Sequence, residues 1–507
     1  MFDLGRSFLA SVERSPDALA LVDGPVRLTY AQWADRVLRV VASFDAQGLK
    51  PGDTVATALQ NTWPMATVHW ACQLAGLTVA PFNWRIKPEE LDYCLPDAGA
   101  RLLIFQDVSA AAVAASPAAQ ALPRVDAAEF ETLLAAEPAP ALSRADAESL
   151  SLLLYTSGTT GKPKGVPRRH RAERAAAVAH VAQNCYAVGE RTLGVMPLYH
   201  TMGVRSLLSM ALIDGLFVCQ PRFDTTGALE LIEGERLTCL YLVPTLYHDL
   251  LANPRFAQTD VSSVRKLGFA GAPMTDGLLQ KLDKAFRPQL FVNHYGSSEI
   301  YTFTINQNAP AKPGSAGKAA LNQRIRVVKL GSHDPDDRAA VGEEGQIIAD
   351  LAGDEAFEGY LNRPDADAKA LHAGWYFTGD TGFFDADGDL FVSGRVDDMI
   401  ITGGENVSPV EIESVLSLHA DVLEVAVAGL PDERWGQKVV AFIKRRAGVD
   451  QTALDAHCRA SGLANFKRPR EYVFIDEIPK SPVGKILRRK LQAGDFQPER
   501  PNRSIPT

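Results

Sequence analysis

The stretch that most constrains this chain is YTSGTTGKPKG at residues 155–165, which follows the apolar run 150–154. The apolar run predicts a short buried strand. Glycines let the backbone approach a ligand closely, and hydroxyl groups, backbone N–H groups and lysines all suit phosphate oxygens. The strand and loop together predict a site for a polyphosphate, with an ordinary surface turn as the alternative.

This loop is not a Walker A motif, which needs four residues between its first glycine and the Gly-Lys-Ser/Thr that ends it. Here two residues separate Gly158 from Gly161, and Pro163 stands where the metal-binding hydroxyl would be. We therefore expect a phosphate-binding loop of another kind.

The segments before this loop alternate between helical and strand-like patterns. Helices are predicted over 29–45 and 65–75, and strands over 54–59 and 77–81. Such alternation is typical of an α/β fold with a largely parallel sheet. Two less regular regions are expected: a variable surface helix or loop at 109–122, and a turn-rich connection between strands of a β-like subdomain at 331–345.

The pattern changes after Gly394 to that of a small α+β unit. A helix is predicted to begin at Ser408, because a serine N-cap, Pro409 at the first helical position and Glu411 three residues after the cap form a start signal. Strands are predicted at 399–402, 422–429 and 438–444, and a second helix at 450–461. Because 507 residues exceed one ordinary core, we expect an N-terminal domain at 1–394, a hinge at 395–398 and a C-terminal domain at 399–507.

Composition limits the class of protein and partner. With 46% hydrophobic and 22% charged residues the chain is expected to be soluble and globular, and its net charge of −9 argues against a nucleic-acid-binding face. The six cysteines form no C-x-x-C pair and lie in apolar surroundings, which indicates buried thiols in a reducing compartment. The chain shows no signal-peptide core and no long apolar run, so we expect no membrane span and a cytoplasmic location.

Three further motifs carry polar groups that suit nucleotide chemistry. Glu299 follows a strand candidate at 290–292 and a Gly/Ser turn, where a carboxylate can hold Mg²⁺ beside phosphates. Asp380 follows a Thr-Gly pair and can accept hydrogen bonds from ribose hydroxyls, and Lys485 stands on a tight loop near the C-terminus. Each of these residues alone is more simply explained as a solvated side chain in a turn.

The order and spacing of the motifs, taken together, resemble the adenylate-forming superfamily of acyl- and aryl-CoA synthetases, adenylation domains of peptide synthetases and luciferases. The resemblance covers essentially the whole chain. It rests on the phosphate loop, Tyr295-Gly-x-x-Glu299, Thr378-Gly-Asp380, Gly394-Arg-x-Asp-Asp398, Gly403-Gly-Glu-Asn406 and Pro479-Lys-x-x-x-Gly-Lys485. Bacterial aryl-CoA ligases of the 4-chlorobenzoate–CoA ligase type are the most similar group, on Met196-Pro-Leu-Tyr-His200, Phe269-Ala-Gly-Ala-Pro273, Gly359-Tyr-Leu-Asn362, Arg434-Trp-Gly-Gln437 and Phe466-Lys-Arg-Pro469.

The resemblance implies a large N-terminal domain of layered α/β and β-rich subdomains and a small mobile α+β C-terminal domain. It also implies an ATP-dependent carboxylic acid–CoA ligase that uses Mg²⁺. In such a ligase the acid attacks the α-phosphate of ATP and releases pyrophosphate, and the thiol of CoA then expels AMP. Lys485, Glu299 and His200 would be catalytic, with Thr156 and Glu299 at the metal and Asp397 as the hinge. The residues implied to bind ATP or AMP are Thr156, Ser157, Gly158, Thr159, Thr160, Lys164, Gly271, Ala272, Pro273, Tyr295, Gly296, Ser298, Asp380 and Arg395.

The resemblance also implies sites for CoA and for the acid. The CoA residues would be Arg85, Gly403, Gly404, Trp435, Phe466, Arg468 and Arg470. For Arg85, a surface salt bridge is the alternative. The acyl pocket would be lined by Ala179, His200, Thr201, Met202, Tyr241, Ala270, Gly271, His294, Gly296, Tyr301 and Thr302.

This implied pocket departs from the chlorobenzoate type, because Ala179 replaces a bulky aromatic residue and four other positions carry polar groups. Buried polar groups need partners, so we expect a ring with a hydroxyl or similar substituent, such as a hydroxybenzoate or a hydroxycinnamate. The alternative is that these side chains satisfy one another or water, with His294 as an ordinary core histidine.

Other functions stay open at this point. Small side chains at Ala176, Ala177 and Ala179 could instead open a channel for a medium-chain fatty acid. A stand-alone adenylation enzyme that loads a carrier protein, a non-catalytic nucleotide-binding regulator and a luciferase-like oxygenase are further alternatives. The expected CoA residues favour CoA as acceptor, and the combination of Lys485, Glu299 and Asp380 favours catalysis. Many members of the superfamily are dimers, so a homodimer is also expected.

Overall fold

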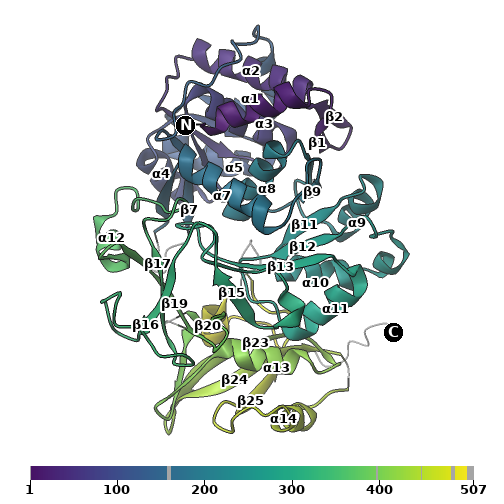
Figure 1. Ribbon diagram of the computed structural model, residues 1–507, viewed down its shortest axis with the longest axis vertical. Coiled ribbons are helices and arrows are strands. Elements are labelled where there is room, and N and C mark those ends of the chain that lie inside the picture. The colour runs from purple at the N-terminus through teal and green to yellow at the C-terminus, as the bar shows by residue number, and fades with distance from the viewer. Residues whose placement is uncertain (1, 157–161, 396–397, 447, 481–485, 500–507) are drawn as a thin grey trace.

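The computed structural model describes residues 2–156, 162–395, 398–446, 448–480 and 486–499 (Figure 1). Three sheets form its framework. In Figure 1 the first helices lie at the top of the molecule and the elements after residue 398 lie at the bottom.

A six-stranded sheet carries the hairpin of the phosphate loop at one edge. Its order is β6-β5-β3-β4-β7-β8, in which β8 (Lys164–Arg169) runs antiparallel to β7 (Leu150–Thr156) and the other pairs are parallel. Helices cover parallel strands on both faces, and accordingly every residue of β3 (Thr54–Ala58) and β4 (Thr78–Pro81) is buried. The other elements of this region are α1 (Leu4–Arg14), α2 (Tyr30–Ala46), α3 (Trp63–Ala75), α4 (Pro88–Asp97), β5 (Ala100–Phe105), α5 (Asp107–Ala115), α6 (Pro117–Gln120), β6 (Arg124–Asp126) and the 3₁₀ helix η1 (Ala127–Leu134).

The helices and strands predicted for this region are confirmed. The helix α2 begins after Thr29, whose hydroxyl accepts from the Gln32 N–H at 3.3 Å while the Gln32 side chain accepts from the Thr29 N–H at 3.0 Å. Such reciprocal bonds satisfy backbone donors that a helix start leaves open. The region 109–122, expected as a helix or loop, is mostly helical in α5 and α6.

A second, longer sheet combines parallel and antiparallel parts. Its parallel part contains β1 (Leu19–Asp23), β10 (Leu216–Cys219), β9 (Arg191–Gly194), β11 (Cys239–Leu242), β12 (Lys266–Phe269) and β13 (Leu290–Tyr295). β2 (Val26–Thr29) pairs antiparallel with β1 at the edge. The helices of this part are α7 (His170–Gln183), α8 (Thr201–Leu212), α9 (Thr225–Gly234), α10 (Pro244–Ala252), α11 (Asp276–Phe286) and the 3₁₀ helix η2 (Pro254–Gln258).

Beyond β13 the same sheet continues as the expected β-rich part. Its strands are antiparallel: β14 (Thr304–Asn306), β15 (Ser315–Ala319), β20 (Leu390–Arg395), β19 (Trp375–Phe384), β17 (Gly345–Asp350) and β16 (Ile325–Lys329), with β18 (Leu371–His372) beside β19. The connection at 331–345 joins β16 to β17, as predicted. The short helices here are η3 (Ala309–Ala311) and α12 (Pro364–Ala370).

The elements after residue 398 form the predicted α+β unit around a five-stranded sheet. The strands are β21 (Ile400–Thr402), β22 (Glu405–Val407), β23 (Val422–Asp432), β24 (Gly436–Arg445) and β25 (Glu471–Phe474), and the helices are α13 (Pro409–Ser417), α14 (Gln451–Ala460) and α15 (Arg488–Gln492). Buried Ile400, Ile412, Val427 and Ile443 contribute to its separate apolar core. The proposed boundaries at 394 and 399 stay a prediction.

The helix predicted to begin at Ser408 is confirmed, although its hydrogen bonds differ from those of a capping box, and the prediction that all six cysteines are buried is wrong. Ser408 is the N-cap of α13, but its hydroxyl donates to the Ser393 carbonyl at 2.5 Å instead of capping the helix, and Glu411 accepts from Lys467 at 2.7 Å. A tertiary contact to β20 therefore replaces the local capping box. Cys185 is exposed, because it follows α7 in a left-handed turn with a φ of 51°, whereas the other five cysteines are buried.

Within the described ranges, no helix combines the length and the apolar character that crossing a bilayer requires.

Candidate functional site

The two strands that flank the expected phosphate loop pair with each other. Thr156 at the end of β7 lies opposite Lys164 at the start of β8, so the loop leaves and re-enters the sheet at neighbouring positions. Ser157, Gly158, Thr159 and Thr160 lie outside the described residues. The amine of Lys164 lies 3.9 Å from the centre of the Tyr360 ring. Burial lowers the pKa of Lys164, and the nearby Glu299 carboxylate opposes that shift.

Glu299 is presented by a tight turn after β13. The turn closes with a hydrogen bond of 2.9 Å from the Ser297 N–H to the Ile300 carbonyl. Gly296 is required there, because a Cβ at this position would stand 2.0 Å from the Tyr301 carbonyl oxygen. Glu299 is only 6% exposed, and its Oε1 accepts a hydrogen bond of 2.6 Å from the Tyr360 hydroxyl. Ser298 lies beside it in the same turn.

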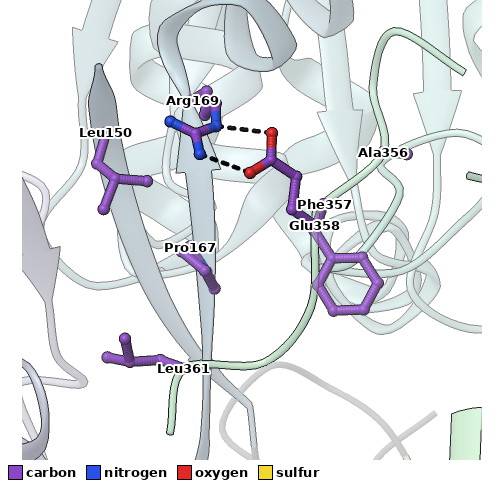
Figure 2. Close-up of a pocket in the computed structure, with 7 residues that line it drawn as sticks. All are labelled: Leu150, Pro167, Arg169, Ala356, Phe357, Glu358 and Leu361. Carbon is purple, nitrogen blue, oxygen red and sulfur yellow. Dashed lines mark hydrogen bonds and ion pairs between the residues drawn. The ribbon is translucent and has the colours of Figure 1, made fainter. Parts of the chain in front are cut away.

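Tyr360 thus contacts both Lys164 at the start of β8 and Glu299. Residues on either side of Tyr360 bond to β8 and to Glu299, and Figure 2 shows one of these interactions. Glu358 forms a two-pronged ion pair with Arg169 of β8, at 2.6 and 2.7 Å. The Leu361 N–H donates to the Gly165 carbonyl at 2.9 Å, and the Phe357 N–H donates to the Glu299 carbonyl at 3.0 Å. A small cavity of about 230 Å³ lies against this segment, lined by Leu150, Pro167, Arg169, Ala356, Phe357, Glu358 and Leu361.

The expected ribose-binding pair is brought together by two strands. Asp380 of β19 and Arg395 of β20 are register partners, and their side chains form an ion pair at 2.8 Å. The hydroxyl of Tyr295, at the end of β13, donates to Asp380 at 2.6 Å. Burial raises the pKa of Tyr295 well above its usual value and Asp380 raises it further, so this phenol stays protonated and donates.

The expected adenine residues follow the neighbouring strand. Gly271, Ala272 and Pro273 follow β12 after one intervening residue, and β12 pairs in parallel with β13 through Phe269 and Asn293. Because parallel strands end at one edge of a sheet, these residues and Tyr295 share that edge. Gly271 has a φ of 82°, and a Cβ there would lie 3.3 Å from Val243 and 3.7 Å from Met202 of the expected acyl pocket.

Part of the expected acyl pocket is a buried aromatic and polar group. The ring centres of Tyr241 and His294 are 5.1 Å apart, and the ring of His180 on α7 lies tilted against both, with centres 4.7 and 5.0 Å away. Asn184 bonds both imidazoles, through Oδ1 to His294 Nε2 at 3.2 Å and through Nδ2 to His180 Nδ1 at 3.1 Å. One nitrogen of each ring thus has a hydrogen-bond partner, but that partner is Asn184, which is not among the expected pocket residues.

Tyr301 and Thr302 belong to a second buried group that carries charge. The Tyr301 hydroxyl donates to Glu173 at 2.9 Å, and Glu173 pairs with Arg168 at 2.7 Å, with both charged side chains fully buried. Arg168 also donates to the carbonyls of Glu299 and Glu355 at 2.8 and 2.6 Å, and so fixes the backbone at Glu299. The N–H of Thr302 donates to the Glu355 carboxylate at 3.1 Å.

The other expected pocket residues lie on α7, at the start of α8 and just after β12. His200 is the N-cap of α8, with its Nδ1 accepting from the Met202 N–H at 3.4 Å. Ala179, Thr201, Met202 and Ala270 are all buried.

The expected CoA residues lie in two places. In the C-terminal unit, Trp435 and Arg470 are in contact, with 4.9 Å between guanidinium and ring centre, and the Gly403 N–H donates to the Trp435 carbonyl at 2.9 Å. Arg468 pairs with Asp455 at 2.8 Å, and Arg468 and Arg470 line one cavity of about 340 Å³. Gly404 is the second glycine of the β21–β22 turn, and Phe466 is 39% exposed.

Arg85 is exposed in the N-terminal region and stacks on Trp84 at 3.8 Å. It forms no ion pair with any residue the structure describes, so a surface salt bridge does not explain it. Asp397 and Lys485 lie outside the described residues.

Sequence reasoning did not assign roles to several residues of this site. Tyr360 lies in a motif that carries the resemblance, yet no role followed from the motif. Two signals in the sequence could have pointed to further residues of this site. His180 and Asn184 lie four residues apart around the end of α7, and Arg205 is the one charged residue of α8.

Known proteins match the chain over nearly its full length. The family model for the AMP-binding enzyme matches residues 8–361, and that for the AMP-binding enzyme C-terminal domain matches residues 411–485. The chain is 33% identical to 4-chlorobenzoate–CoA ligase of Arthrobacter sp, covering 97% of this chain and 95% of that protein. It is 35% identical to feruloyl-CoA synthase of Amycolatopsis sp, covering 94% and 96%.

A solved structure agrees with these matches. The anthranilate–CoA ligase AuaEII in complex with anthranoyl-AMP superposes with a TM-score of 0.90 at 26% identity, over 97% of each chain. The chain therefore belongs to the AMP-binding enzyme family, and the resemblance to adenylate-forming acyl- and aryl-CoA ligases that its motifs indicate is confirmed.

Proposed function

We propose that this protein joins an aromatic carboxylic acid to CoA through an acyl-adenylate, with release of pyrophosphate and then AMP. One observation carries the nucleotide half of the proposal. Residues from the phosphate hairpin, the Glu299 turn and the 356–361 segment meet at Tyr360, which contacts both Lys164 and Glu299. Asp380, Arg395 and Tyr295 form the matching ribose end.

The first half-reaction brings a carboxylate against a triphosphate, so it needs positive charge and N–H donors around the phosphates. We assign Lys164 and the 155–165 loop to the β- and γ-phosphates. We assign Lys485 to the bridge between the carboxylate and the α-phosphate, a role that suits a compact charge on a flexible stem. Arg168 holds the backbone at Glu299, and His200 at the start of α8 faces the acid.

Glu299 and Thr156 offer a carboxylate and a hydroxyl oxygen, the hard ligands that Mg²⁺ prefers. Only one Glu299 oxygen is engaged by the Tyr360 hydroxyl, so the residues present fit a magnesium ion. Bound there, the ion would neutralise charge on the phosphates. In the absence of the ion, the negative charge of Glu299 offsets the positive charge of the neighbouring Lys164.

For the second half-reaction, we propose that the C-terminal unit rotates about Asp397. Lys485 then withdraws and the Gly403–Gly404 turn lines the path of the CoA thiol, as in gating by domain rotation. Trp435 and Phe466 offer rings for the CoA adenine, and Arg85, Arg468 and Arg470 offer charge for its phosphates.

An aromatic acid with a polar substituent fits the acyl pocket better than a fatty acid. The rings of Tyr241 and His294 suit a flat apolar face, whereas their polar atoms, with those of His180, suit a substituent oxygen. A fatty acyl chain would leave these polar groups buried without partners, which costs free energy.

A panel of acids tests the proposal. Purified enzyme with ATP, Mg²⁺ and CoA is offered benzoates, cinnamates and medium-chain acids, and AMP release is measured for each. Substituted aromatic acids are expected to give the highest kcat/KM. A clear preference for medium-chain acids would favour fatty acyl-CoA synthesis, and AMP release without acyl-CoA formation would favour a carrier protein as acceptor.

We also propose a cytoplasmic location, where ATP and CoA are available and thiols stay reduced, and a homodimer. Light scattering on the purified protein measures the oligomeric state directly.

A further inference from the structure

A buried arginine joins the two groups of the acyl pocket, and no role has been assigned to it. Arg205 lies on α8 and is only 2% exposed. Its guanidinium carbon is 5.2 Å from the Tyr301 ring centre and 6.0 Å from that of Tyr241. We call Arg205, Tyr241, Tyr301, His180 and His294 the Arg205 cluster.

The hydrogen-bonding capacity of Arg205 is largely unused. Its Nη1 donates a long bond of 3.4 Å to the Tyr241 hydroxyl, and its buried Nε has no partner. Within the described part of the chain it forms no ion pair, whereas the neighbouring Arg168 pairs with Glu173. A buried cation without a bonded carboxylate is costly, so this position favours an outside partner.

The two imidazoles of the cluster also have unused atoms. His180 Nε2 and His294 Nδ1 are buried and have no hydrogen-bond partner among the described residues. Burial lowers the pKa of His294 well below its usual value, and the charge of Arg205 lowers it further. Burial likewise lowers the pKa of His180, with smaller contributions from His294 and Arg205. Both rings are therefore neutral, and Arg205 supplies the positive charge of the cluster.

Glu355 is a buried acidic residue whose charge interacts with that of Arg205, but its carboxylate bonds to other groups. Its carboxylate accepts from the Thr302 N–H and from the Asn322 side chain at 3.1 and 3.3 Å. Burial raises the pKa of Glu355, whereas the charges of Arg205 and Arg168 lower it. Glu355 thus reduces the cost of burying Arg205 without occupying its donors.

The backbone of Arg205 is displaced along α8 from His200, which the proposed function sets beside the reacting carboxylate. It lies five residues beyond His200, about 7.5 Å along the helix axis at 1.5 Å per residue.

We propose that Arg205 is a specificity-determining residue that binds an oxygen substituent, a hydroxyl or a second carboxylate, at the end of the acid remote from the reacting carboxylate. The planar guanidinium donates to that oxygen, while His180 and His294 complete its hydrogen bonds and the tyrosine rings flank the aromatic ring. This inference rests on the proposed function, since it names the class of acid that the same pocket selects.

The test compares matched acids in the full-length enzyme and in Arg205→Met. The acids are benzoate, 4-hydroxybenzoate and 1,4-benzenedicarboxylate, with the corresponding cinnamate set, and kcat/KM is measured by AMP release. The wild-type enzyme is expected to prefer at least one oxygen-substituted acid over its unsubstituted partner by about 10-fold or more. Arg205→Met is expected to reduce that ratio by about 10-fold, mainly through the KM of the substituted acid. The substituted acid whose kcat/KM falls most in Arg205→Met shows whether Arg205 binds a hydroxyl or a carboxylate.

Control variants separate recognition from folding. Arg324→Met makes the same change on a side chain that is 71% exposed and should leave the ratio unchanged. Arg205→Lys keeps the charge and should retain part of the preference for the substituted acid. Tyr241→Phe removes only the hydroxyl bonded to Arg205 and should reduce the kcat/KM ratio between substituted and unsubstituted acid by about 3-fold. If Arg205→Met does not fold by its melting curve, Arg205→Lys and Tyr241→Phe decide the matter.

An equal loss of activity on all acids, an unchanged ratio, or a wild-type preference for unsubstituted acids would overturn the role of Arg205. Absence of AMP release from every acid in the wild type would instead overturn the proposed function itself.

Discussion

The proposed nucleotide end and the proposed acid end of the site differ in how their polar groups are satisfied. At the nucleotide end, Asp380 bonds Arg395 and Tyr295, and Glu299 bonds Tyr360, at distances from 2.6 to 2.8 Å. At the acid end, Arg205 makes one long bond of 3.4 Å, and buried atoms of His180 and His294 have no partner among the described residues.

The difference follows from what each end must do. Every turnover uses the same ATP, so protein groups can hold its binding residues in place before it arrives, and such preorganisation lowers the cost of binding and reaction. Discrimination between acids instead requires polar groups that only the correct acid satisfies. Changes at the nucleotide end should therefore affect all acids equally, and changes at the acid end should affect them selectively.

The largest effect is expected for Lys485→Ala, which should slow adenylate formation by about 1,000-fold for every acid, because one preorganised charge at a transition state has an effect of this order. ATP–pyrophosphate exchange measures this step. Thioester formation from supplied acyl-adenylate should stay near normal, and Lys490→Ala, on a side chain 52% exposed, is the control. Equal loss of both half-reactions would contradict the role of Lys485.

Glu299→Gln should reduce adenylate formation by about 100-fold and raise the Mg²⁺ concentration needed for half-maximal rate, because the amide is a poorer ligand for a hard cation. A magnesium titration at saturating ATP is the measurement. Glu230→Gln, on a side chain 58% exposed, should change neither value. An unaltered magnesium requirement would remove Glu299 from the metal site.

Asp380→Asn should raise the KM for ATP by about 10- to 30-fold, since charge-assisted hydrogen bonds contribute about 1.5–3 kcal/mol each. The ranking of acids should not change. Asp387→Asn, on a side chain 76% exposed, controls for the loss of one carboxylate. If the ranking of acids shifted while the KM for ATP stayed the same, the assignment of Asp380 to the nucleotide end would be wrong.

Arg468→Ala and Arg85→Ala should each raise the KM for CoA by about 5-fold while pyrophosphate release continues at its normal rate, because a phosphate contact is lost at a partly exposed site. Steady-state kinetics with varied CoA tests this, with Arg255→Ala as the control on a side chain 52% exposed. An unaltered KM for CoA would exclude that residue from the CoA site.

The smallest effect concerns pH. Burial holds the pKa of His180 and of His294 well below the usual value, so both rings stay neutral above that lowered pKa and neither gains charge near neutral pH. The ratio of kcat/KM between a substituted and an unsubstituted acid should therefore stay constant from about pH 6 to about pH 8. A ratio that follows an ordinary histidine titration would show that one ring protonates in the pocket.

The sequence by itself determined the local elements and the order of the motifs. Apolar runs and alternation indicated β7, β3 and α3, an amphipathic pattern indicated α2, and the spacing from the phosphate loop to Lys485 indicated the family. These signals are short-range or depend only on chain order, so they can be detected without knowledge of the packing.

Only the tertiary structure decided which side chains meet. Tyr360 lies between Lys164 and Glu299, residues more than a hundred positions apart, and Arg205 lies between Tyr241 and Tyr301 from two other parts of the chain. Ser408 shows the same limit, because its hydroxyl bonds Ser393 instead of its own helix. Such contacts depend on how strands and helices cross in space, and local patterns in the sequence carry no record of that geometry.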